Sequence, residues 1–198
     1  MPLAAELKAD FEWAKSIAVG PGLSMNVAAA EITRCVLERD DKVRILDADA
    51  LNIIAGEHID YKGSREGQII ITPHIMEMSR LTGKAVADIK EHMIESAKEY
   101  AIQHSCICIL KDARTVVTDG QKVYINCTGN DGMSTGGCGD VLTGLIAGMT
   151  AMGLDAFEAA CLSVYVHGKA GDYAASGKGR AGMTAADVSE AIAYVLKR

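Results

Sequence analysis

The stretch CTGNDGMSTGGCGD, residues 127–140, places five glycines ahead of an apolar segment and ends on a carboxylate, Asp140. A helix that starts here would present unpaired backbone N–H groups and a partial positive charge at its first turn. Glycines let the backbone fold closely around an anion because they carry no Cβ, and phosphate is the anion that such sites usually bind. The stretch matches neither GxxxxGK[ST] nor a GxGxxG after a first strand. It therefore predicts an anion site of another kind.

The carboxylate of Asp140 stands out in this setting because a bound phosphate would repel it. One explanation is general-base catalysis, in which Asp140 takes the proton from a hydroxyl group that attacks the phosphate. The other is that Asp140 is only a residue of the first helical turn, where the helix dipole favours negative charge. The residues alone leave both interpretations open.

Short apolar runs and longer amphipathic segments alternate along the chain. The runs bounded by turn residues predict strands at 16–19, 43–47, 68–72 and 106–111, and a hairpin of 115–119 with 122–126. Helices are expected at 25–38, 49–54 with Asp49 as cap, 76–82, 86–104, 141–152, 155–175 and after a capping Thr184. The alternation predicts an α/β fold with a mostly parallel central sheet flanked by helices, in a single domain of residues 1–198.

The composition restricts the kinds of partner. A net charge of −6 argues against a nucleic acid or an anionic membrane surface, and no apolar run is long enough to cross a membrane. The N-terminus lacks the apolar core of a signal peptide. Six cysteines without a CxxC pair are typical of reduced thiols, so a cytoplasmic location is expected. His104, Cys106 and Cys108 lack a second ligand pair at zinc spacing, so no metal site is predicted.

A family resemblance follows from six ordered segments. TGNDGMSTGGCGDVLTGLIAGM closely resembles the C-terminal signature of the ADP/ATP-dependent NAD(P)H-hydrate dehydratases, a branch of the ribokinase-like superfamily. The segments IAVGPGLS, LDADALNIIAG, TPHIMEMSRLTG, LKDART and YVHGKAGD match the same family in order. The resemblance implies a ribokinase-like fold that is truncated at the N-terminus, since family members carry roughly an extra third there. The sheet is expected to lack its first strands, and the chain to form a homo-oligomer or to need an N-terminal partner segment.

The resemblance also implies a reaction. Hydrated NADH or NADPH (NADHX, NADPHX) carries a hydroxyl group on its nicotinamide ring. ADP or ATP, with Mg²⁺, phosphorylates that hydroxyl group, and loss of phosphate then restores the double bond. Asp140 would take the hydroxyl proton, and the N–H groups of Gly137, Cys138 and Gly139 would hold the phosphoryl charge.

Further site residues carry over by position. The resemblance assigns nucleotide binding to Lys111, Asp112, Ala113, Arg114, Thr115 and Gly139, and substrate binding to Gly22, His74 and Asp140. Without the resemblance, Gly22 would be interpreted as a turn glycine and His74 as a loop histidine. His74 and Glu77 could also be a pair of metal ligands. Additional polar candidates are Asp47, Asp49, Asn52 and Asn130.

Two residues near the glycine stretch have separate expectations. Cys138 would lie among the N–H groups of the helix start, which predicts a lowered thiol pKa; the alternative is that it only fills the place of a serine as a small residue. His167 lies in an apolar segment and is expected to be structural.

Two other functions remain open. One is a ribokinase-like kinase of a small alcohol, and the other is a non-catalytic nucleotide-binding protein. The TPH and KDART segments together favour the dehydratase.

Overall fold

The centre of the molecule is a six-stranded sheet with the strand order β1–β2–β3–β4–β5–β6. The computed structural model describes residues 7–63 and 69–197. The first four strands run parallel, and the last two add antiparallel pairs. Their bounds are β1 (Ser16–Val19), β2 (Val43–Leu46), β3 (Ile69–Ile71), β4 (Ile107–Leu110), β5 (Val116–Thr118) and β6 (Val123–Ile125). The predicted mostly parallel α/β sheet is confirmed, although Gln68 of the predicted third strand lies outside the described residues.

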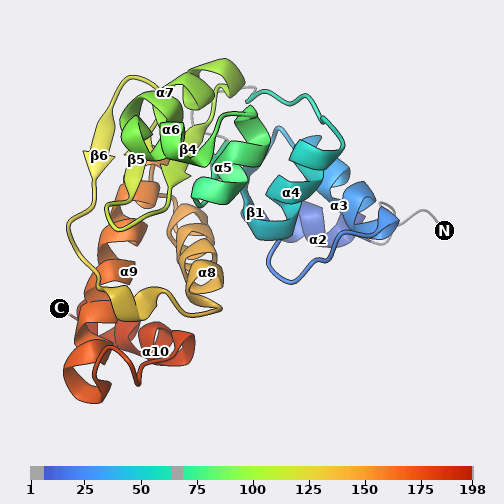
Figure 1. The fold of residues 1–198 in the computed structure, drawn as a ribbon. Coiled ribbons are helices and arrows are strands. Elements are labelled where there is room, and N and C mark those ends of the chain that lie inside the picture. Colours follow the sequence, from blue (N-terminus) through green and yellow to red (C-terminus); the bar gives the residue numbers. More distant parts are fainter. Residues whose placement is uncertain (1–6, 64–68, 198) are drawn as a thin grey trace.

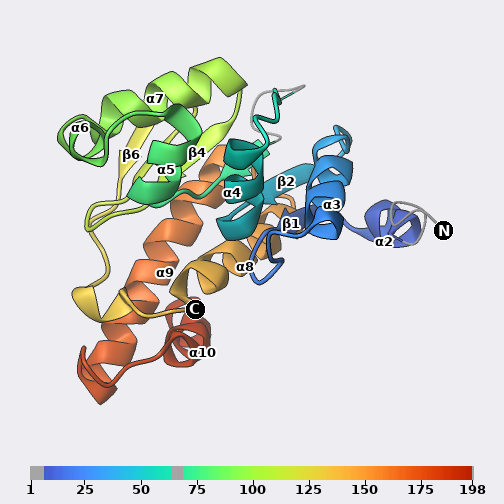
Figure 2. The ribbon, with the colours of Figure 1, turned by 45° about the vertical axis from the view of Figure 1, so that its right-hand side comes forward.

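Helices cover both faces of the sheet because its strands are apolar on both faces. On one face Leu46, Ile71 and Cys108 pack against five helices. These helices are α3 (Val27–Leu37), α4 (Ala48–Gly56), α5 (Ile75–Thr82), α6 (Val86–Glu91) and α7 (Met93–His104). Figure 2 shows α3 on the right, α4 near the middle and α5, α6 and α7 on the left.

The opposite face is covered by the C-terminal half of the chain. Ile45, Ile70 and Ile107 of the sheet pack against α8 (Cys138–Ala151) and α9 (Ala156–Lys178). The last helix, α10 (Ala185–Val195), packs on α9 away from the sheet, as Figure 1 shows. The predicted capping box of this helix is confirmed, since Thr184 and Asp187 bond each other's backbone N–H groups.

Three local predictions differ from the structure. The helix predicted at 86–104 is divided into α6 and α7 at His92, where the backbone leaves the helical region (φ −125°, ψ 50°). A short helix that was not predicted, α2 (Lys8–Trp13), precedes β1. Asp49 does not cap α4, because that helix begins one residue earlier with Asp47 as its N-cap. The Asp49 carboxylate instead accepts the N–H of Ser24 at 2.8 Å.

The parallel strands end at a common edge, and a tight turn after β1 shapes that edge. Gly20 has φ +125°, and a Cβ at this position would lie 1.8 Å from the carbonyl oxygen of Asp47. The neighbouring carbonyl of Val19 accepts the N–H of Asp47 at 3.1 Å. The ends of β1 and β2 are therefore in backbone contact, which only a glycine permits.

None of the helices within residues 7–63 and 69–197 is long and apolar enough to cross a membrane.

The close contact at Gly20 predicts a large effect of a single methyl group. We expect Gly20→Ala to lower the free energy of unfolding by about 2 kcal/mol or more, since the strands must separate or the turn must strain. Urea denaturation would measure it. Gly148→Ala is the matched control, because Gly148 is an exposed helical glycine with open space around its Cβ position. The control should gain about 0.5–1 kcal/mol, and equal stability of Gly20→Ala and wild type would contradict the contact.

Candidate active site

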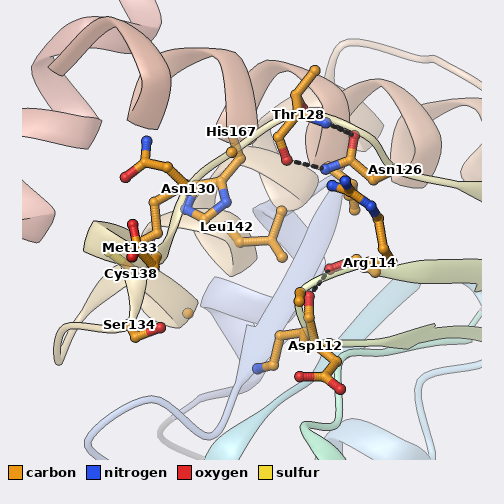
Figure 3. A pocket seen from close by; sticks show the side chains of 18 of the residues that line it. Asp112, Arg114, Asn126, Thr128, Asn130, Met133, Ser134, Cys138, Leu142 and His167 are labelled. Atoms are coloured by element: carbon orange, nitrogen blue, oxygen red, sulfur yellow. Dashed lines mark hydrogen bonds between the residues drawn. The ribbon is translucent and has the colours of Figure 1, made fainter. Parts of the chain in front are cut away.

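A cavity of about 770 Å³ lies between the segment after β4, the loop after β6 and helices α8 and α9. It brings together all five predicted nucleotide-binding residues of the KDART segment with Cys138 and Gly139 of the helix start. His74 and Asn130 also line it. In Figure 3 the side chains of His167 and Leu142 lie between Asn130 on one side and Arg114 on the other. Segments distant in the sequence thus form a single cavity.

The other predicted site residues lie outside the lining of this cavity. They are Gly22, Asp47, Asp49, Asn52, Gly137 and Asp140. Asp140 is exposed and is the third residue of α8. Since each helical residue turns the side-chain direction by about 100°, Asp140 and the cavity-lining Gly139 face different directions. The exposed Asp140 carboxylate therefore lies next to a lining residue in the sequence but outside the lining itself.

The helix start has the backbone features of an anion site. Gly137 is the N-cap and adopts the left-handed conformation with φ 90°. The N–H of Cys138 donates to the Thr135 carbonyl oxygen at 3.4 Å. Within the described part of the chain, the hydrogen bonds leave the N–H groups of Gly137 and Gly139 without an acceptor. Two of the three predicted donors are therefore free to bind an anion.

A buried carboxylate holds the basic side chain of the site in place. Asp47 accepts a hydrogen bond from Lys111 Nζ at 2.8 Å on one oxygen and from Thr143 Oγ1 at 2.8 Å on the other. Burial alone would raise the pKa of Asp47, but the Lys111 charge and the hydrogen bonds, including one from Thr72, lower it below its ordinary value. A Cβ built on Gly139 would lie 3.5 Å from Lys111 Nζ. The ammonium group thus adjoins the helix start.

His74 has a structural role as well as a place in the cavity. Its Nδ1 accepts the N–H groups of Met76 and Glu77 at 3.1 and 3.2 Å, which caps α5. Burial, followed by the charges of Lys111 and Arg80, lowers the pKa of His74. The ring is therefore neutral at pH 7, and its proton lies on Nε2, 3.4 Å from Glu77 Oε1. Since Glu77 returns a bond to the His74 backbone N–H, this pair is a helix cap.

The expectation of a lowered Cys138 pKa is wrong. Burial raises the pKa of this thiol, and a backbone hydrogen bond with Thr135 offsets only part of the effect. The side chain packs in an apolar cluster with Ala170, Met183 and Val188. The sequence places Cys138 at the helix start correctly, but the thiolate is disfavoured because the thiol lies in the core.

The contribution of α9 to the cavity was not predicted from the sequence. His167, which was expected to be structural, lines the cavity, and its Nε2 is buried without a hydrogen-bond partner. Burial lowers the pKa of His167 to about 4. Asp172, one turn further along, accepts the N–H of Gly129 and the side-chain amide of Asn130, both at 3.1 Å. The one signal available was an acid and a histidine within the small and apolar residues of YVHGKAGD.

The loop after β6 packs closely against α9. A Cβ on Gly168 would lie 2.2 Å from Thr128 Oγ1, and that hydroxyl group donates to the carbonyl oxygen of Tyr165 at 3.0 Å. Among the described residues no group of three or more His, Cys, Asp or Glu side chains is placed to hold a metal ion.

The mostly parallel sheet with helices on both faces is that of a ribokinase-like α/β protein. A ribokinase-like superfamily protein from Enterococcus faecalis superposes with a TM-score of 0.85 at 27% identity, covering 96% of this chain and 66% of its own. The chain belongs to the NAD(P)H-hydrate dehydratase family, whose sequence model matches residues 2–194. The family resemblance is thereby confirmed.

Two further relatives are similar over most of the chain. The bifunctional NAD(P)H-hydrate repair enzyme Nnr of Moorella thermoacetica is 45% identical over 183 residues, which are 91% of this chain and 34% of that enzyme. The ADP/ATP-dependent NAD(P)H-hydrate dehydratase of Bacillus subtilis, co-crystallized with ATP/Mg²⁺ and soaked with CoA, has a TM-score of 0.82 and 33% identity, covering 91% of this chain and 65% of its own. The chain thus spans between a third and two-thirds of the length of these relatives.

The Asp47–Lys111 pair predicts a pH-dependent stability. A lowered carboxyl pKa contributes stability above the unfolded pKa of about 4, and that contribution is lost as the pH falls through the folded pKa. We expect Asp47→Asn to cost about 3 kcal/mol at pH 7, with a smaller difference from wild type below about pH 4. Denaturant unfolding at several pH values would measure it.

Thr150→Val is the control for this measurement, because Thr150 is a buried hydroxyl group in α8, the helix of Thr143, and bonds only backbone carbonyl oxygens. Its loss of about 1 kcal/mol should be equal at both pH values. A pH-independent loss in Asp47→Asn would show that the charge on Asp47 contributes nothing.

Proposed function

We propose that this chain catalyses the nucleotide-dependent dehydration of hydrated NADH or NADPH. The observation that carries the proposal is the single cavity formed by the KDART segment and Gly139, one residue before the exposed Asp140. A nucleotide in this cavity has its phosphates at the start of α8, and the Asp140 carboxylate follows in the first turn of that helix. This arrangement suits transfer of a phosphoryl group from the cavity toward Asp140.

The nucleotide in this proposal is ADP or ATP, as in the ADP/ATP-dependent relative from Bacillus subtilis. The phosphates lie against the N–H groups of Gly137 and Gly139, where the helix dipole adds positive charge. Lys111, held beside Gly139 by Asp47, neutralises further phosphate charge. Mg²⁺ enters with the nucleotide as part of the substrate complex.

The second substrate lies on the Asp140 side. Asp140 accepts the proton of the ring hydroxyl group, whose oxygen attacks the terminal phosphorus, and the bond from that phosphorus to the nucleotide oxygen breaks. The phosphorylated ring then expels phosphate as the C–O bond breaks. A proton leaves the neighbouring carbon, and its electron pair forms the restored double bond. The nicotinamide stays reduced throughout, so the sequence needs no oxidant.

His74 and Gly22 contact the substrate in this proposal. The neutral His74 ring carries its proton on Nε2, which suits it to donate a hydrogen bond to a substrate oxygen. Gly22 has φ +65° and no atom within 4 Å of its Cβ position, so its backbone is open to a ligand.

Replacing Asp140 tests the catalytic step. We expect Asp140→Asn to lower turnover of hydrated NADH by about a hundredfold or more, because the base is lost, while the nucleotide still binds. The absorbance of reduced nicotinamide, with ADP or ATP and Mg²⁺, reports turnover, and calorimetry reports nucleotide binding. Asp155→Asn is the control, since it changes the N-cap carboxylate of α9, which lies outside the cavity lining.

The products of the same assay separate the competing functions. NADH and free phosphate support the dehydratase, whereas a stable phosphorylated alcohol would identify a kinase. Binding of nucleotide without turnover would identify a non-catalytic protein. Near-wild-type turnover in Asp140→Asn would leave Asp140 as a residue of the helix start only.

We further propose that residues 1–198 act as one domain in the cytoplasm. All six cysteines are unpaired thiols in the structure, which supports a reducing compartment.

We also propose that the edge of β1 is covered in the active protein, by a second copy of the chain or by a separate N-terminal segment. Within the described part of the chain β1 pairs only with β2, and Ala18 on it is exposed. An open strand edge in a parallel sheet is a site for pairing with another strand.

Assembly is tested by light scattering over a dilution series, run beside the absorbance assay. The chain should be larger than a monomer where it is active, or should gain activity when an N-terminal fragment of a relative is added. A monodisperse monomer with full activity would contradict the proposal.

A further inference from the structure

A second recess lies beside α4 and α5, outside the lining of the nucleotide cavity. Its volume is about 500 Å³, and its walls come from the segment after the Gly20 turn, from α4 and from α5. The lining residues are Met25, Asn52, Ala55, Gly56 and Arg80. None of them lines the nucleotide cavity, so the proposed phosphoryl transfer does not use this recess.

The recess is joined to the site through the elements that form it. The N–H of Ser24, next to Met25, donates to the Asp49 carboxylate on α4 at 2.8 Å. Arg80 lies on α5, the helix that His74 caps, six residues after His74. A rise of 1.5 Å per residue separates the two positions by about 9 Å along the helix. A ligand with one end at His74 can therefore reach Arg80 with the other.

The recess contains a basic group without an acidic partner. Arg80 Nη1 donates to Asn52 Oδ1 at 2.7 Å, and the ion pairs among the described residues do not include Arg80. The guanidinium group has five N–H donors in a planar fork, which suits it to bind phosphate oxygens in pairs. Arg80 is exposed, so these donors are accessible.

The rest of the recess is apolar and open. Met25 is 57% exposed, and Ala55 and Gly56 add little side-chain volume beside it. A thioether makes favourable contacts with aromatic rings and adapts to their shape. A flat base can therefore lie on this surface while a phosphate pairs with Arg80.

We propose that this recess binds the adenylate half of the dinucleotide substrate, with Arg80 on one of its phosphates and the base on Met25. The inference rests on the proposed function and deepens it, because it names the residues that hold the half of the coenzyme that does not react. Binding energy from this remote half would hold the nicotinamide ring at His74 and Asp140.

The test compares substrates with and without the adenylate half. Hydrated reduced nicotinamide mononucleotide lacks it, NADHX carries it, and NADPHX adds a 2′-phosphate. We expect Arg80→Gln to raise the KM for both dinucleotides by about tenfold or more, the loss of one charged hydrogen bond. The KM for the mononucleotide and for ADP or ATP should not change. An effect on NADPHX alone would support the recess and assign Arg80 to the 2′-phosphate.

Two variants control the experiment. Arg39→Gln removes an arginine from the opposite end of the sheet, before β2, where it pairs with Asp41 at 3.1 Å, and it should change no KM. Arg80→Lys keeps the charge but loses the fork, so its KM for NADHX should lie between those of wild type and Arg80→Gln. Equal changes for mononucleotide and dinucleotides, or no change in Arg80→Gln, would overturn the proposal.

A binding measurement keeps the inference separate from the reaction. Fluorescence titration with NADH, NADPH and reduced nicotinamide mononucleotide needs no turnover. Arg80→Gln should weaken the two dinucleotides and leave the mononucleotide unchanged, even if wild type dehydrates none of the hydrated forms, which would reject the proposed function alone. If wild type binds the dinucleotides no more tightly than the mononucleotide, the recess does not bind the adenylate half.

Discussion

The ion pair between Asp47 and Lys111 joins the parts of the molecule on which the site depends. Asp47 follows β2, Lys111 follows β4, and Thr143, which donates to the same carboxylate, lies in the second turn of α8. The contact therefore ties two parallel strands of the sheet to the helix whose start forms the anion site. A carboxylate this deeply buried must be paired, because an uncompensated charge in the interior is costly. The same pairing places a cation beside Gly139, where phosphate charge would be neutralised.

The glycine contacts follow from this arrangement. Gly20 lets the end of β1 approach the backbone of Asp47, and Gly168 lets the loop after β6 lie against α9. At both glycines, atoms of the neighbouring segment occupy the space that a Cβ would fill. The cavity lies between such closely packed segments, so its shape is set by the backbone as much as by the side chains that line it. Asp172 also holds the loop after β6 against α9, because its carboxylate accepts hydrogen bonds from the Gly129 N–H and the Asn130 side-chain amide.

The cavity and the helix start carry charges of both signs. Lys111, Arg114 and the neutral rings of His74 and His167 line the cavity, and the carboxylate of Asp140, outside this lining, is exposed. The carboxylates of Asp112 and Asp131 also line the cavity. The recess at Arg80 is separate and is formed by Met25 and by residues of α4 and α5.

The mostly parallel sheet, the order of its strands and the family could be predicted from local features of the chain, namely apolar periodicity, turn residues and ordered motifs. The resemblance also predicts that KDART and the glycine stretch are site segments, and in the structure both line one cavity. The fold was needed to show that Asp49 binds the Ser24 amide and does not cap a helix, that the Cys138 thiol lies in an apolar cluster, and that His167 lines the cavity. It also placed Arg80 in a recess with Asn52. Each of these depends on which distant segment packs against the residue, and burial and hydrogen-bond partners set by such contacts do not follow from local sequence.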